Sequence, residues 1–163
     1  KLSNNEMLEV CKLHNVEVDK NSNSGQILDS IMSELVEPKL VNPTFVIDYP
    51  KSISPLAKSK RDGSEEIVER FELFIGGSEF ANSFSELNDP IDQRSRLEEQ
   101  SKLRDQGDDE AQPIDEDFIN AMEIGMPPTG GVGIGIDRLV MLLTNNRWIK
   151  DVILFPTMKP EKN

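Results

Sequence analysis

The chain has 163 residues, of which 36% are hydrophobic and 29% are charged, enough for one domain with a buried core. Its formal net charge of −12 makes the general surface unsuited to nucleic acid, whose phosphates bind clustered Lys and Arg. Cys11 is the single cysteine, which excludes an intrachain disulfide and a cysteine zinc site and fits a reducing, cytoplasmic location. No apolar run approaches the roughly 20 residues that cross a bilayer, so no membrane association is expected.

The first half of the chain predicts helices followed by strands. Apolar residues at helical spacing indicate two short helices within residues 6–37, with Ser24 as the N-cap of the second and Pro38 beyond its end. Residues 44–47 favour a strand, and the charged stretch 58–66 favours a loop. Residues 68–75 and 78–87 are predicted as two strands, joined by Gly76-Gly77 in a tight hairpin turn.

The second half predicts two helices and then a glycine-rich strand. Pro90 suits the first turn of a helix that runs toward Leu103, the acidic stretch 105–110 interrupts it, and residues 117–124 form another short helix. The alternation of residues 132–136 predicts a strand, followed by a helix from Asp137, its N-cap, through Leu143. Residues 152–156 predict a last short strand.

Three glycines, Gly131, Gly133 and Gly135, share one face of the glycine-rich strand. Because glycine weakens a strand, either a flat group such as an adenine ring lies against this backbone or a neighbouring element packs closely there. Arg138 follows in the first turn of the next helix, where a cation opposes the helix dipole. Binding of an anion such as a triphosphate would explain it, and a structural ion pair is the alternative.

The predicted hairpin carries two carboxylates on one face. With a two-residue turn Phe74 lies opposite Glu79, so Glu72 and Glu79 point to the same side of the sheet. Converging carboxylates suit a hard cation such as Mg²⁺ that bridges to phosphates. A solvated acidic face would give the same pattern.

A second row, Asn82, Phe84 and Glu86, alternates beyond the turn. By strict parity this row lies on the face opposite Glu79, so a β-bulge between Glu79 and Asn82 is needed for one pocket to contain both rows. An amide, an aromatic ring and a carboxylate in one row suit an ammonium ligand. A polar outer face, with Phe84 as ordinary core, is the alternative.

Several long segments of the sequence resemble class II lysyl-tRNA synthetases. They run from Arg70 to Glu79, Ala81 to Pro90, Gly133 to Leu139 and Asp151 to Pro156, and the resemblance extends from about Leu8 to Pro160. It implies an α+β fold, the class II aminoacyl-tRNA synthetase catalytic core in part, with an antiparallel β-sheet flanked by helices. It also implies a lysine–tRNA ligase that activates lysine with ATP and Mg²⁺ and transfers it to tRNA(Lys), working as a homodimer in its full length.

The resemblance assigns roles to residues that match the family's motifs. Glu72 and Glu79 would hold Mg²⁺ and the ATP phosphates, and Asn82, Phe84 and Glu86 would line the lysine pocket, with Glu86 meeting the ammonium. For ATP, the resemblance implies Gly133 under the adenosine, Gly135 beside it, and Arg138 as the catalytic arginine at the γ-phosphate end.

The family's first and second motifs and its anticodon-binding barrel are not found in the sequence. Residues 1–163 are therefore expected to be a C-terminal portion of the catalytic domain, with little or no aminoacylation activity alone. Two alternatives are a shortened paralogue that lysylates a translation elongation factor and a non-catalytic acidic fragment that docks on a partner. Aspartyl and asparaginyl relatives share the fold, but the carboxylate of Glu86 suits a cationic substrate better.

Overall fold

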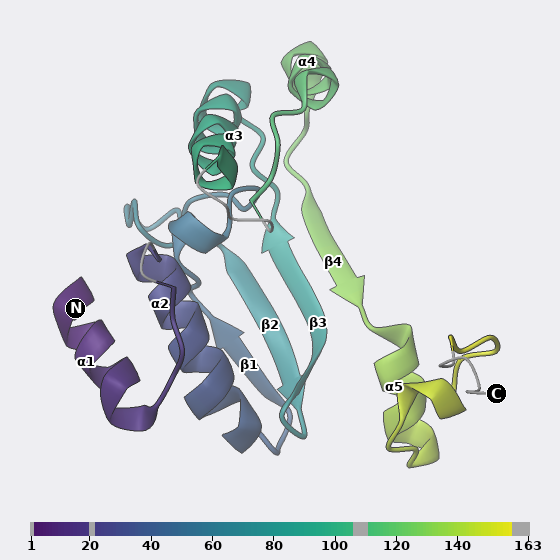
Figure 1. Cartoon of the computed structure of the whole chain (residues 1–163). Helices are drawn as coiled ribbons and strands as arrows, with labels where there is room; N and C mark the ends of the chain where they lie inside the picture. Colours follow the sequence, from purple (N-terminus) through teal and green to yellow (C-terminus); the bar gives the residue numbers. More distant parts are fainter. Residues whose placement is uncertain (1, 20–21, 106–110, 158–163) are drawn as a thin grey trace, which may run out of the picture.

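A single four-stranded antiparallel sheet forms the centre of the computed structural model, which describes residues 2–19, 22–105 and 111–157. The strands are β1 (Thr44–Ile47), β2 (Arg70–Ile75), β3 (Ser78–Ser85) and β4 (Gly130–Ile134), paired in that order. Figure 1 shows α1 and α2 beside β1, α3 and α4 near one end of the strands, and α5 beyond the end of β4. The predicted antiparallel sheet flanked by helices is confirmed.

The N-terminal helices are α1 (Asn4–His14) and α2 (Ser24–Ile31). Each begins with a capping box, at Ser3 and at Asn23, so the prediction of Ser24 as an N-cap is wrong by one residue. The side chain of Asn23 accepts the Gln26 N–H at 3.0 Å and leaves Ser24 as the first helical residue. After α2 the chain continues through a π-helical turn, Met32–Val36, and a 3₁₀ turn, Glu37–Lys39.

Helices α3 (Pro90–Asp105) and α4 (Glu116–Gly125) confirm the two predicted in the acidic region. They pack through Leu97, Ile119 and Met122. The buried Arg96 side chain ties α3 to the loop before β2, because it donates to the Ala57 carbonyl at 2.7 Å. The predicted interruption lies mostly at 106–110, outside the described residues.

The hairpin between β2 and β3 has the predicted two-residue turn. Ile75 pairs with Ser78 and Phe74 with Glu79 around Gly76-Gly77. Both glycines have positive φ, 61° and 74°, which is the conformation that favours glycine in such turns. The segment after the 3₁₀ turn packs on them, since the Gly77 N–H donates to the Leu40 carbonyl at 3.0 Å.

A β-bulge follows in β3, between Glu79 and Asn82, where one pocket that contains both polar rows requires it. The register shifts between Leu73, which pairs with Ala81, and Phe74, which pairs with Glu79, so Phe80 is the extra residue. Beyond the shift Glu72 lies opposite Asn82. The bulge therefore brings both predicted rows to one face of the sheet.

The C-terminal part holds β4, α5 (Ile136–Thr144) and a 3₁₀ turn, Ile149–Asp151. β4 ends two residues earlier than predicted, and the N-cap of α5 is Gly135, so Asp137 is not the cap. As the second residue of α5, Asp137 still places its charge where the helix dipole favours an anion. Arg138 lies in the first turn, as predicted.

The predicted strand at 152–156 is wrong, because these residues form bends and turns. The backbone N–H groups of Val152 and Ile153 both donate to the Ile149 carbonyl, at 3.1 and 3.2 Å. Leu154 and Phe155 are almost fully exposed. A β-favouring run forms a strand only where a partner supplies the ladder, and none of the described strands pairs with it.

The two faces of the sheet differ in polarity. Glu72 and Asn82 occupy one face, and the opposite face carries the exposed apolar side chains of Phe45, Ile47, Val132 and Ile134. Among the helices of the described ranges, none combines the length and the apolar character that a membrane span requires.

Candidate active site

Glu72 is the centre of a hydrogen-bonded cluster on the polar face. Its carboxylate accepts the Tyr49 hydroxyl at 2.6 Å, the Arg70 guanidinium at 2.5 Å and the Asn82 amide at 3.0 Å. The residue is only 8% exposed, so its charge depends on these three donors. The structure thus joins two predicted site residues, Glu72 and Asn82.

Arg70 links this cluster to the neighbouring loop. Its guanidinium also donates to the Asn82 side-chain oxygen at 3.2 Å and to the Ser54 hydroxyl at 2.8 Å, and it lies 4.6 Å from the centre of the Tyr49 ring. Burial, followed by the hydrogen bond to Glu72, raises the pKa of Tyr49, which keeps its hydroxyl a donor. Neither Arg70 nor Tyr49 is among the site residues predicted from the sequence. The available signal was the i, i+2 spacing of Arg70 and Glu72, which places a cation beside a carboxylate on one strand face.

Glu79 and Arg138 meet at the other end of β3. The Arg138 guanidinium donates to the Glu79 carbonyl and lies 3.8 Å from its carboxylate. Both side chains remain about half exposed. Glu37 adds a further carboxylate to this surface. Burial raises the pKa of Glu37, and the nearby charges of Glu72 and Glu79 contribute to the rise. The surface is therefore acidic, with one arginine at its rim.

Glu86 lies past the end of β3, beside β4. Its backbone N–H donates to the Thr129 carbonyl at 2.9 Å, which holds the start of β4 against it. Burial raises the pKa of Glu86, and no hydrogen bond or ion pair to the described residues stabilises its carboxylate. The side chain borders a cavity of about 250 Å³, which Lys58 and Ser85 also line.

The three glycines of the glycine-rich strand, Gly131, Gly133 and Gly135, have three different surroundings. A Cβ at Gly131 would lie 2.1 Å from a Glu86 carboxylate oxygen, whereas one at Gly133 would meet only the Asn82 carbonyl, at 3.8 Å. A Cβ at Gly135 would lie 3.6 Å from the Arg138 side chain. Close packing therefore explains Gly131, and open space above the strand remains at Gly133.

Phe84 faces the same side as Asn82 and lies opposite Gly131 of β4. It packs, partly buried, against the cluster of Tyr49, Ala57 and Val68. This contact supports the core interpretation of Phe84, and its place in a ligand pocket stays a prediction.

The predicted metal pair, Glu72 and Glu79, depends on the acceptor positions that remain on the two carboxylates. A carboxylate has about four lone-pair positions, and Glu72 uses two on Oε1, for Arg70 and Asn82, and one on Oε2, for Tyr49. One position on Oε2 is left, and the half-exposed Glu79 adds its own oxygens. Mg²⁺ commonly takes one or two carboxylates plus substrate phosphates and water. The two side chains fit this donor set, although no cluster of three or more metal-ligating residues occurs in the described part of the chain.

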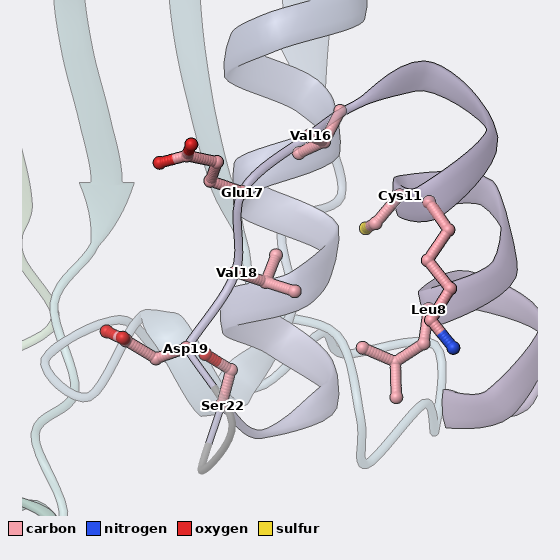
Figure 2. Close-up of a pocket in the computed structure, with 8 residues that line it drawn as sticks. Leu8, Cys11, Val16, Glu17, Val18, Asp19 and Ser22 are labelled. Carbon is pink, nitrogen blue, oxygen red and sulfur yellow. The ribbon is translucent and has the colours of Figure 1, made fainter.

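A larger cavity, about 800 Å³, lies far from these residues in sequence and in structure. Figure 2 shows it between α1 and the segment that follows, lined by Leu8, Cys11, Val16 and Val18. Its lining also includes the polar or charged side chains of Lys12, Glu17, Asp19 and Ser22, and it holds none of the predicted site residues. Size alone therefore does not identify the functional site of this chain.

Comparisons with known proteins identify the family of this chain. The family described as tRNA synthetases class II (D, K and N) matches residues 8–159. A lysine–tRNA ligase of Azobacteroides pseudotrichonymphae is 54% identical over 99% of this chain and 32% of its own length. That of Thermoanaerobacter pseudethanolicus is 56% identical over 97% and 32%, and that of Prochlorococcus marinus (strain MIT 9215) is 61% identical over 90% and 29%.

These matches also define how much of a relative the chain represents. It spans about a third of the length of the curated relatives that it matches. The match to the family covers almost the whole chain, and the antiparallel sheet agrees with it. The chain therefore belongs to the class II tRNA synthetases of the D, K and N group.

Proposed function

We propose that the protein containing this chain is a lysine–tRNA ligase, which activates lysine with ATP and transfers it to tRNA(Lys). We propose further that it uses Mg²⁺, acts in the cytoplasm and works as a homodimer. The names of its relatives support the first statement. The remaining statements rest on the resemblance described above.

The observation that carries the proposal is the unpaired carboxylate of Glu86. It is partly buried, burial raises its pKa, and no described residue forms an ion pair or hydrogen bond with it, because in the same cavity the Lys58 ammonium donates to Asn88 and the Arg61 guanidinium to Glu69. An ammonium group that enters the site would pair with it. A neutral side chain would leave the carboxylate desolvated and alone, and such unpaired groups commonly cost about 2–5 kcal/mol. The site therefore favours a cationic amino acid.

Lysine activation is an in-line attack of the lysine carboxylate on the α-phosphate of ATP, which breaks the α–β phosphoanhydride bond, forms lysyl-adenylate and releases pyrophosphate. The residues contribute position and charge. Arg138, which is half exposed, is suited to bind the γ-phosphate end by its planar fork. Gly133 leaves room for the adenosine on β4, with Gly135 next to it. A Mg²⁺ ion held by Glu72 and Glu79 would neutralise phosphate charge.

The experiment that tests this proposal is amino-acid-dependent exchange of pyrophosphate into ATP, with lysine, arginine and aspartate compared. It is run on this chain and on the full-length product of its gene. Exchange with lysine alone by the full-length product supports the proposal. Exchange with aspartate in place of lysine, or no exchange, refutes it. Labelled lysine offered to tRNA and to an elongation factor then identifies the acceptor and separates the ligase from the paralogue.

A further inference from the structure

The Glu86 carboxylate lies against Gly131 of β4. A Cβ built on Gly131 would be 2.1 Å from Oε1 and 3.3 Å from the carboxyl carbon of Glu86. Gly131 pairs with Phe84 of β3, and Glu86 follows Phe84 by two residues, just past the end of that strand. The absence of a side chain at Gly131 is thus what allows the carboxylate to lie this close to β4.

A methyl group at this position would move the carboxylate outward. Ordinary van der Waals contact begins near 3.4 Å, so an atom now 2.1 Å away must retreat by about 1.3 Å. The Cβ of a strand residue projects out of the sheet, and the displacement is therefore toward the space above the polar face. One methylene group lengthens an extended aliphatic chain by about the same distance, roughly 1.3 Å, because its C–C bonds are near 1.5 Å.

We propose that Gly131 is a specificity-determining position: by letting Glu86 lie against β4, it sets the depth of the ammonium pocket and so the chain length of the amino acid accepted. This rests on the proposed lysine activation. Gly131 acts through Glu86 and touches no substrate, so it is a positioning residue. The unmodified pocket takes lysine, and the pocket of Gly131→Ala is one methylene shallower and favours ornithine.

The expected stability effect separates this role from a structural one. The atom that a Cβ would meet is the end of a flexible side chain, so Gly131→Ala moves the carboxylate at little cost to folding. Gly130→Ala is the matched control, because a Cβ at Gly130, the neighbouring residue of β4, meets nothing within 4 Å. Both variants should unfold at nearly the same temperature as the unmodified protein.

The test measures kcat and KM for lysine and ornithine in pyrophosphate exchange by the full-length gene product. One methylene in a fitted pocket is worth about 10–200-fold in kcat/KM. Gly131→Ala should therefore shift the lysine-to-ornithine ratio toward ornithine by about 10-fold or more, mainly through KM, with the KM for ATP unchanged. Gly130→Ala should leave the ratio unchanged. Adding Glu86→Asp to Gly131→Ala retracts the carboxylate by one methylene and should restore the preference for lysine.

An unchanged ratio in Gly131→Ala, with lysine activated normally by the unmodified protein, would overturn the inference and leave the proposed function standing. No activation of lysine by the unmodified protein would instead refute the proposed function. The crystal structure of Gly131→Ala tests the placement independently of activity. A Glu86 carboxylate displaced from β4 supports it, and a carboxylate still lying on residue 131 overturns it.

Discussion

Replacing Arg70 by methionine should be among the most destabilising single changes in the sheet. The Arg70 and Glu72 side chains are only 17% and 11% exposed and lie 2.5 Å apart. Methionine keeps much of the apolar stem but leaves the Glu72 carboxylate with only the Tyr49 and Asn82 donors. Breaking a buried ion pair from one side costs about 3–5 kcal/mol, or roughly 6–20 °C in melting temperature for a domain of this size.

The assay is urea unfolding of this chain followed by circular dichroism, with the melting temperature as a second measure. Arg61→Met is the matched control, because Arg61 pairs with Glu69 at 2.7 Å but is 77% exposed. Such surface pairs contribute about 0–1 kcal/mol. Adding Glu72→Gln to Arg70→Met removes the uncompensated charge and should recover part of the loss, as expected for coupled neighbours. If Arg70→Met costs no more than Arg61→Met, the reasoning is refuted.

Three further predictions follow from the same structure. In the full-length product, Glu86→Gln should raise the KM for lysine in pyrophosphate exchange by about 30-fold or more, the kinetic equivalent of about 2 kcal/mol, and leave the KM for ATP unchanged; an unchanged lysine KM ends the role of Glu86. Gly77→Ala should destabilise the chain in urea by about 1 kcal/mol more than Gly76→Ala. Both glycines have positive φ, but only a Cβ at Gly77 meets backbone, the Pro38 Cα at 3.3 Å. Equal losses of stability would contradict the steric argument. Hydrogen bonds from Arg61 and from the Ser85 side chain lower the pKa of Glu69 from 4.5 to about 2, so the Glu69 carboxylate stabilises the fold above pH 4.5 and the contribution is lost as pH falls toward 2. Because Arg61 is the larger cause, the urea midpoints of the unmodified chain and Arg61→Met should approach each other over that range, and a constant gap would exclude the pair as its cause.

The hairpin was predictable because its geometry follows from local rules. A two-residue glycine turn fixes the register near it, and Phe74 does pair with Glu79. Two polar rows that parity places on opposite faces then require one inserted residue, and Phe80 is that residue. From the sequence the bulge was only the condition for a single polar face, and the register of β2 and β3 is what shows that it is present.

The hydrogen-bond partners of the site were harder to predict, because they come from distant parts of the chain. Tyr49 lies 23 residues before Glu72, and Ser54 lies 16 before Arg70. No spacing rule relates residues across a loop of that length, so the donors that satisfy the Glu72 carboxylate became evident only in three dimensions. The wrong strand at 152–156 has the same origin, since pairing partners decide whether a β-favouring run becomes a strand.

The glycine stripe shows how one sequence pattern can serve different purposes at neighbouring positions. The alternation of Gly131, Gly133 and Gly135 predicted one cause, either a ligand or close packing. The structure separates them, since a carboxylate occupies the space over Gly131 and the space over Gly133 is open. Periodicity reports which face a residue occupies but not what lies above it. On this strand the glycine that faces the Glu86 carboxylate and the proposed adenosine surface are therefore only two residues apart.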